Sequence, residues 1–131
     1  MKEETKQWLE KANKDLNRAK ILINFDDYED CLFHLQQAIE KYFKAYLIDN
    51  DAFKENLHKT HNLKFLLKEC SKIDKDFENL LDKNSIKLLS LGIIVRYPFP
   101  IEIKKEDIEE LIEIAEKVKN FVSNKLKEKL E

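Results

Sequence analysis

Side chains that can bind a phosphate recur along one face of a strongly helical segment, residues 31–45. They occupy positions i, i+3, i+7 and i+10 of one helix ridge and consist of His34, Gln37, Lys41 and Lys44. An imidazole, an amide and two ammonium groups can together hold a phosphate or contact the edge of a base. The solvated face of an amphipathic helix has the same appearance, so spacing alone leaves both interpretations open.

Two later segments could extend this ridge. His61 opens a predicted helix, where free backbone amides favour an anion, or it hydrogen-bonds within the protein and fixes the preceding loop. Arg96 is one of only two arginines and directly precedes Tyr97. A guanidinium beside an aromatic ring suits phosphate binding and stacking, although the same arginine could cap carbonyl groups at a helix end.

Several classes of site have no support in the sequence. The chain contains no Walker A loop, GxGxxG, GxSxG, HExxH or paired Glu-x-x-His motif. His58 and His61 lack a third ligand at metal-binding spacing, so we expect no metal and no cofactor. Cys31 and Cys70 lie in different segments, and reduced buried thiols are the simplest interpretation of both.

Composition indicates one soluble domain over residues 1–131. Hydrophobic residues make up 43% and charged residues 38%, and the net charge of −2 provides no global field that would attract nucleic acid. No apolar run is long enough to span a bilayer, and the N-terminus lacks the apolar region of a signal peptide. We therefore expect a cytoplasmic protein without a membrane partner.

Apolar residues at spacings of three and four predict long amphipathic helices over residues 3–23, 28–48 and 105–129. Asp27 can cap the second of these helices. Its apolar arc is wider than one neighbour needs, so this helix should be central in the fold. Phe33 and Ile48 lie outside the arc, either as ordinary exposed residues or as part of a dimer surface.

Two more helices complete the predicted architecture. After a polar loop over residues 49–60, Thr60 or Asn62 can cap a short helix that ends near Ile73. Asp74 then begins a helix that continues to about residue 95, where a short buried strand is the alternative, and the prolines at 98 and 100 end it. One glycine and two prolines argue against an all-β fold. We expect an all-α protein, an antiparallel up-and-down bundle of four long helices plus one short helix.

Four separated blocks, in this order, resemble the HEPN family, a domain of higher eukaryotes and prokaryotes associated with nucleotide binding. The resemblance covers nearly the whole chain, and the blocks are Trp8-x3-Ala12-x2-Asp15-Leu16-x2-Ala19, His34-x-Gln36-Gln37-Ala38-x-Glu40-Lys41-x2-Lys44-Ala45, Thr60-His61-x-Leu63-x2-Leu66-Leu67 and Arg96-Tyr97-Pro98. The resemblance implies a helical bundle that binds nucleotide or nucleic acid. It also implies that the chain forms a homodimer and pairs with a minimal nucleotidyltransferase, as toxin–antitoxin members do.

Many members of that family are metal-independent ribonucleases with an arginine followed, after four to six residues, by a histidine. Neither Arg96 nor Arg18 has a histidine at those offsets. We therefore expect a non-catalytic protein; an RNA-cleaving toxin and a purely structural dimer module are the alternatives. Asp15 could orient one of the cations or lie exposed. The expected nucleotide-binding residues are His34, Gln37, Lys41, His61, Arg96 and Tyr97.

Overall fold

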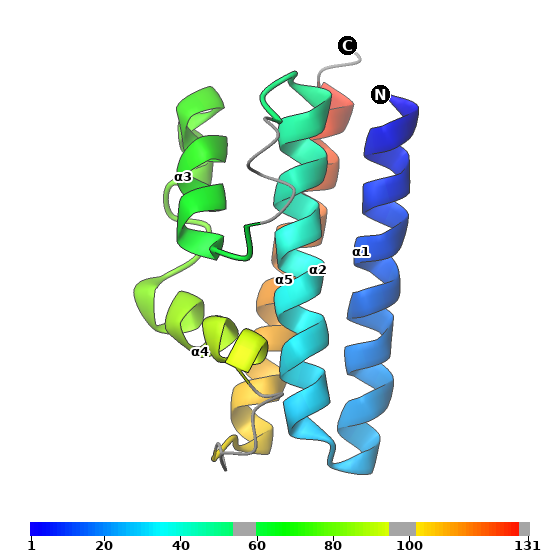
Figure 1. Ribbon diagram of the computed structural model, residues 1–131, viewed down its shortest axis with the longest axis vertical. Helices are drawn as coiled ribbons and strands as arrows, with labels where there is room; N and C mark the ends of the chain where they lie inside the picture. Colours follow the sequence, from blue (N-terminus) through cyan, green and yellow to red (C-terminus); the bar gives the residue numbers. More distant parts are fainter. Residues whose placement is uncertain (54–59, 95–101, 129–131) are drawn as a thin grey trace.

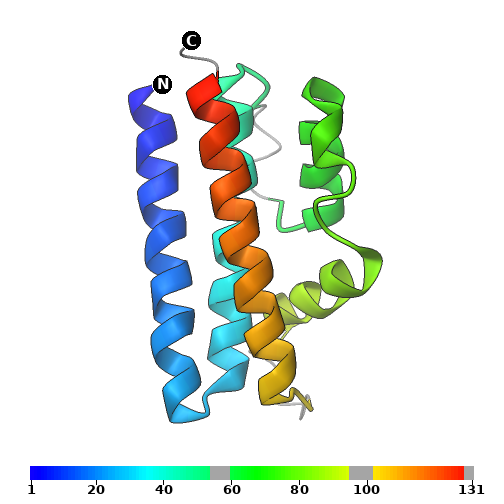
Figure 2. The ribbon, with the colours of Figure 1, turned by 180° about the vertical axis from the view of Figure 1, so that it is seen from behind.

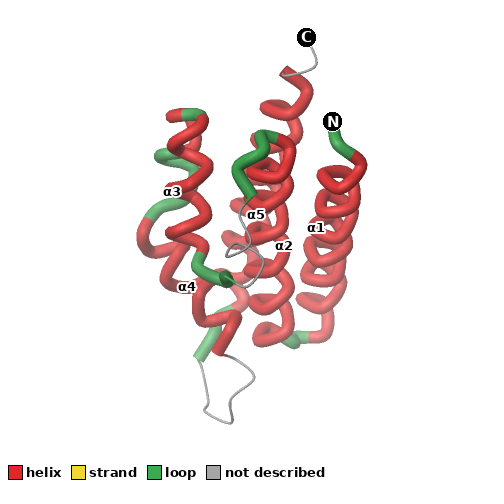
Figure 3. Tube along the Cα trace, turned by 45° about the horizontal axis from the view of Figure 1, so that its top comes forward, coloured by secondary structure: helices red, strands yellow, loops and turns green. Residues whose placement is uncertain are grey.

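The computed structural model describes residues 1–53, 60–94 and 102–128 as helices joined by short turns (Figure 1). The described α-helices are α1 (Glu3–Leu22), α2 (Tyr28–Asp49), α3 (Leu63–Ile73), α4 (Lys83–Ile94) and α5 (Lys105–Glu128). Two 3-10 turns, η1 (Ile23–Phe25) and η3 (Lys75–Phe77), lie between them. Figure 3 shows no strand in the described part of the chain, so the all-α prediction is confirmed and the strand alternative near residue 90 is wrong for the part up to Ile94.

The first two helices form an antiparallel hairpin with a tight, capped turn. Asp26 adopts a left-handed conformation with φ of 58°, and its carboxylate accepts a hydrogen bond from the Tyr28 hydroxyl at 2.9 Å. The carboxylate of Asp27 accepts the backbone N–H of Asp30, which confirms the predicted cap of α2. This hairpin forms the most extensive helix pair of the fold and places the length of α1 beside α2.

The second helix is central, as its wide apolar arc predicts. It contacts α1, α3, α4 and α5, and its Tyr42 and Phe43 rings are fully buried. Figures 1 and 2 show α1 and α5 on one part of its surface and the α3–α4 pair on another. Ile48, expected outside the arc, is only 4% exposed, whereas Phe33 is partly buried. None of the described helices is both long and apolar enough to cross a membrane.

The segment after α3 differs from the single long helix that its period predicts. Asp74 accepts the N–H of Asp76 and begins only the turn η3, whose Phe77 inserts into the core against Tyr46 and Phe121. A new cap at Asp82 then begins α4, which has 12 residues. In the described ranges α1, α2 and α5 are therefore long, and α3 and α4 are short.

The chain direction also departs from strict alternation. The colour ramp of Figures 1 and 2 shows that α1 runs opposite to both α2 and α5, while α2 and α5 run in the same direction. Between the end of α2 and the start of α5, the chain crosses back to the opposite end of the molecule through α3, the turn η3 and the oblique helix α4. Gly92 allows α4 to approach α2 closely, because a Cβ atom at this position would lie 2.8 Å from the Leu32 carbonyl oxygen and 3.1 Å from Cβ of Gln36.

Candidate functional site

Two buried carboxylates organise the polar face of α2. Asp15, from α1, binds His34 and Lys41, and we call these three residues the Asp15 cluster. Glu40, from α2 itself, binds side chains on both sides of it along the helix and one from the segment before α3. The residues of this Glu40 cluster are Gln36, Gln37, Glu40, Lys44 and His61.

The Asp15 cluster joins α1 to α2 through both oxygens of one carboxylate. Asp15 is 4% exposed; its Oδ1 lies 2.9 Å from His34 Nδ1 and its Oδ2 lies 2.5 Å from Lys41 Nζ. An ionised carboxylate only accepts, so Nδ1 of His34 carries the proton and donates it. The alternative in which Asp15 lies exposed is wrong, and the prediction that it orients a cation is confirmed.

The Glu40 cluster buries an ion pair within one helix. The side chains of Glu40 and Lys44 are each 3% exposed, and Lys44 Nζ donates to Oε1 of Glu40 over 2.7 Å. The same ammonium lies 5.7 Å from the centroid of the Trp8 ring, within cation–π range. The alternative in which Lys44 lies on a solvated helix face is therefore wrong: its ammonium lies between Glu40 of α2 and Trp8 of α1 and neutralises a buried carboxylate.

The remaining members connect this ion pair to the α3 side of the molecule. Gln36, fully buried, donates to Oε2 of Glu40 over 3.0 Å and to the backbone carbonyl of His61 over 3.3 Å. His61 Nδ1 donates to Glu40 over 3.1 Å, while half of its ring is exposed. Gln37 donates to Oε1 of Gln36 over 2.8 Å. The alternative in which His61 hydrogen-bonds within the protein is therefore confirmed, while most of the loop before it lies outside the described residues.

The structure brings four of the six predicted site residues to one face of α2. His34 and Lys41 belong to the Asp15 cluster, and Gln37 and His61 belong to the Glu40 cluster. Arg96 and Tyr97 lie outside the described residues. The side chains of His34 and Lys41 are 17% and 23% exposed, so both reach the surface, while the buried Asp15 carboxylate fixes their orientation.

Sequence reasoning did not assign a role to the two residues that hold the second cluster, Gln36 and Glu40. Both lie one helix turn from a partner, since positions 36, 40 and 44 form an i, i+4 row. A glutamate in the middle of the helix whose wide apolar arc predicts a central place was the available signal, because a buried carboxylate requires a cation and hydrogen-bond donors.

The charges of the two clusters nearly cancel. Two carboxylates face two ammonium groups, and the two imidazoles add positive charge only when they are protonated. The face therefore offers oriented donors more than excess charge. Chemically, such an array suits an anionic ligand whose oxygens accept several hydrogen bonds.

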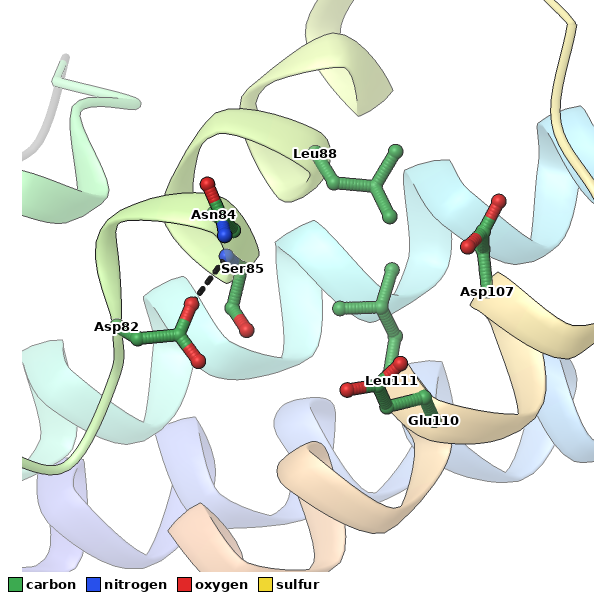
Figure 4. A pocket seen from close by; sticks show the side chains of 7 residues that line it. All are labelled: Asp82, Asn84, Ser85, Leu88, Asp107, Glu110 and Leu111. Carbon is green, nitrogen blue, oxygen red and sulfur yellow. Dashed lines mark hydrogen bonds between the residues drawn. The ribbon is translucent and has the colours of Figure 1, made fainter.

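Two hollows are relevant to ligand size. One, of about 480 Å³, is open and lies beside His61, with Thr60, Asn62, Ser90 and Ile93 as its other lining residues. The other, of about 240 Å³, lies between α4 and α5 (Figure 4) and includes three carboxylates, those of Asp82, Asp107 and Glu110. It contains none of the predicted site residues, and its negative charge opposes phosphate. Within the described ranges, no group of three His, Cys, Asp or Glu residues could hold a metal ion.

Comparisons with known proteins agree with this arrangement of helices. The model of the HEPN domain family matches residues 5–126. A protein of Methanocaldococcus jannaschii whose name describes it as a putative toxin is 32% identical over an alignment that covers 95% of this chain and 89% of that protein. The crystal structure of an archaeal HEPN homologue superposes with a TM-score of 0.59 at 22% identity, covering 95% of this chain and 98% of that one. The chain therefore belongs to the HEPN domain family.

Proposed function

We propose that this chain is a toxin-type HEPN protein whose polar face on α2 binds the phosphate of a nucleotide or of RNA without cleaving it. Family membership and the similarity to a relative named as a toxin support the first part. The polar clusters support the second part.

One observation carries the binding proposal: a buried carboxylate fixes a lysine and a histidine side by side at the surface. Asp15 holds Lys41 through one oxygen and His34 through the other. Lysine side chains normally lose much rotamer freedom when they bind a ligand. Because the carboxylate already restricts Lys41, less of this entropy remains to be lost when a phosphate arrives.

We assign roles by donor type and position. Lys41 contacts a phosphate oxygen. Beside it, Gln37 donates the N–H that otherwise makes its 3.4 Å contact with Glu40, and His34 donates from Nε2 in its protonated form. His61, at the rim of the open hollow, contacts the remainder of the ligand. Arg96 and Tyr97 supply a second phosphate contact and a stacking surface in this proposal, which the family resemblance motivates.

Binding measurements with defined probes test this proposal. We would titrate ATP and a 12-nucleotide oligouridylate into the full-length protein, its Lys41→Ala variant and a Lys11→Ala control on the outer face of α1. A charged hydrogen bond contributes about 1.5–3 kcal/mol, so Lys41→Ala should weaken binding by about 10- to 100-fold. Equal affinities of Lys41→Ala, Lys11→Ala and the unmodified protein would contradict the proposal.

Arg96 receives a separate test, because its role rests on resemblance rather than on described geometry. Arg96→Ala should weaken binding of the same probes by a similar factor, and Arg96→Lys should restore only part of it, since an ammonium cannot replace the guanidinium fork. Unchanged binding in Arg96→Ala, with Lys41→Ala still impaired, would remove Arg96 from the site and leave the rest in place.

The family resemblance also motivates a homodimer and a minimal nucleotidyltransferase partner. Both are proposals. Analytical ultracentrifugation of the purified chain tests the first, with a sedimenting mass of one protomer as the contradicting result. Co-expression with a nucleotidyltransferase encoded beside this chain, followed by affinity purification of the chain, tests the second. The two proteins should purify together when co-expressed and separately when each is expressed alone.

A second candidate function, metal-independent RNA cleavage, is favoured by the Asp15–His34 pair. A carboxylate that binds Nδ1 of an imidazole leaves Nε2 to accept or donate a proton, which is the arrangement of a general base. The test is incubation of RNA with the protein and EDTA. Cleavage lost in both His34→Ala and Arg96→Ala would establish this function, whereas intact RNA would exclude it.

A further inference from the structure

The seam between α3 and α4 is a separate feature of the surface. Both helices pack mainly against α2, and they contact each other only slightly. A groove of about 350 Å³ remains between them. In Figure 1, α3 and α4 lie on the opposite side of α2 from α1. Its lining contains none of the candidate site residues.

The floor of this groove is mainly apolar. Leu67, Leu81 and Ile86 line it, and Ser71 turns its hydroxyl back to donate to the Leu67 carbonyl at 2.8 Å. Because that hydroxyl is already bonded to its own helix, it does not offer the groove a free donor. An apolar floor of this kind is stabilised when it is covered by apolar side chains.

The rim of the groove is mainly cationic. Lys64 and Lys68, one turn apart on α3, stand on one side, and Lys83 of α4 stands on the other. All three are exposed, and none forms an ion pair with any residue that the structure describes. Glu78 is the one carboxylate among the lining residues. Elsewhere exposed lysines do find acidic partners, as Lys72 does with Glu69 at 2.9 Å.

We propose that this groove docks an amphipathic helix of a partner protein, with apolar residues in the groove and acidic residues against the lysines. The apolar floor accepts side chains at i, i+3 or i+4 and i+7, as in other helix-in-groove complexes. The 11 residues of α3 extend over about 16 Å, which three turns of a docked helix match. Charge complementarity selects an acidic partner, since three lysines face one glutamate.

Nucleic acid fits this surface less well. A phosphate backbone would satisfy the lysines but would leave the leucine and isoleucine floor uncovered, and protein–nucleic acid interfaces are polar. The inference does not depend on the α2 site, so either proposal can fail without the other.

The test uses three synthetic 15-residue peptides and the full-length protein. The first peptide is helical and amphipathic, with leucine along one stripe and glutamate on its flanks; the second has the same composition in scrambled order; the third has lysine in place of glutamate. Fluorescence polarisation at low salt measures binding. The first peptide should bind at least tenfold more tightly than the other two.

Two groove variants and a control locate the binding. Lys64→Glu/Lys68→Glu should weaken binding of the first peptide by about tenfold, because two attractive rim contacts become repulsive. Ser71→Phe should weaken it by filling the groove without changing charge. Lys11→Glu/Lys14→Glu, which reverses two exposed lysines on α1, should leave it unchanged. Circular dichroism would confirm that all variants fold.

Three results would overturn the proposal. The first is equal binding of the ordered and scrambled peptides. The second is full binding by both groove variants. The third is displacement of the peptide by a 12-nucleotide oligouridylate that itself loses affinity in Lys64→Glu/Lys68→Glu, which would assign the lysines to nucleic acid.

Discussion

The buried ion pair between Glu40 and Lys44 leads to a quantitative prediction of stability. Both side chains are 3% exposed and 2.7 Å apart, so removing either charge takes away the buried counter-ion that this pair provides to the other. Breaking such a pair costs about 3–5 kcal/mol. Glu40→Gln should fall at the lower end, near ~3 kcal/mol, because the amide oxygen can still accept from Lys44.

A double-mutant cycle separates the pair from its surroundings. Lys44→Met should also cost about 3 kcal/mol, since it leaves Glu40 with only neutral donors and a histidine. The double variant Glu40→Gln/Lys44→Met has no uncompensated charge, so it should cost well below the sum of the single changes. We expect a coupling energy of about 2–3 kcal/mol, which is large beside the typical 5–15 kcal/mol stability of a domain.

Urea unfolding followed by circular dichroism measures these free energies. The matched control is Glu69–Lys72, also an ion pair within one helix, in which the lysine side chain is 62% exposed. Breaking this exposed pair should change the free energy of unfolding by less than about 0.5 kcal/mol. The reasoning is refuted if Glu40→Gln costs under about 1 kcal/mol, or if the two single changes at Glu40 and Lys44 are additive.

Three further predictions concern the fold around the site. Gly92→Ala should lower the free energy of unfolding by about 1–3 kcal/mol, because the added Cβ would meet the Leu32 carbonyl. This is the opposite of the effect that alanine usually has in a helix. An unchanged or raised urea midpoint would contradict the close approach of α4 to α2. The pKa of Asp82 is lowered, chiefly because its carboxylate accepts the backbone N–H of Ser85 at the start of α4. The stabilisation that this carboxylate provides is therefore present above pH ~4 and is lost as the pH falls through its folded pKa. Asp82→Ala should lower the urea midpoint at neutral pH and flatten the acid limb of the stability curve, and an equally steep limb in this variant would contradict the role of this cap. Burial raises the pKa of Cys31 to about 11 and that of Cys70 well above its usual range. A thiol reagent at neutral pH should therefore label both cysteines only after urea unfolding. Rapid labelling of the folded chain would contradict this, because it would show that the thiols are accessible.

Local sequence signals predicted the helices well where caps and periods agreed. The ends of α1, α2 and α5 lie within one residue of their predicted positions, and Asp27 and Asn62 both act as caps. The segment after Ile73 was harder, because its apolar period continues across a real break. Asp74 caps a short turn and Asp82 caps a new helix there, and Phe77 between them is buried against other aromatic rings, a tertiary contact that the local period does not predict.

The candidate site was predictable in part for a similar reason. Helical spacing correctly grouped His34 with Lys41, since both lie on one side of α2. It could not show that Lys44 is buried, because the depth of a side chain depends on the neighbouring helix and on Trp8. Nor could it show that Glu40 links His61 to α2, a contact between segments far apart in the chain.

The central claim is that the two clusters on α2 bind one phosphate-containing ligand. The most direct measurement is an NMR titration of the imidazole signals of the full-length protein with ATP. Our account predicts that the ring signals of His34 and His61 shift together and saturate at one ligand concentration, and that Lys41→Ala raises that concentration by about 10-fold or more. Saturating ATP binding that leaves both imidazoles unshifted, or no binding at all, would contradict it.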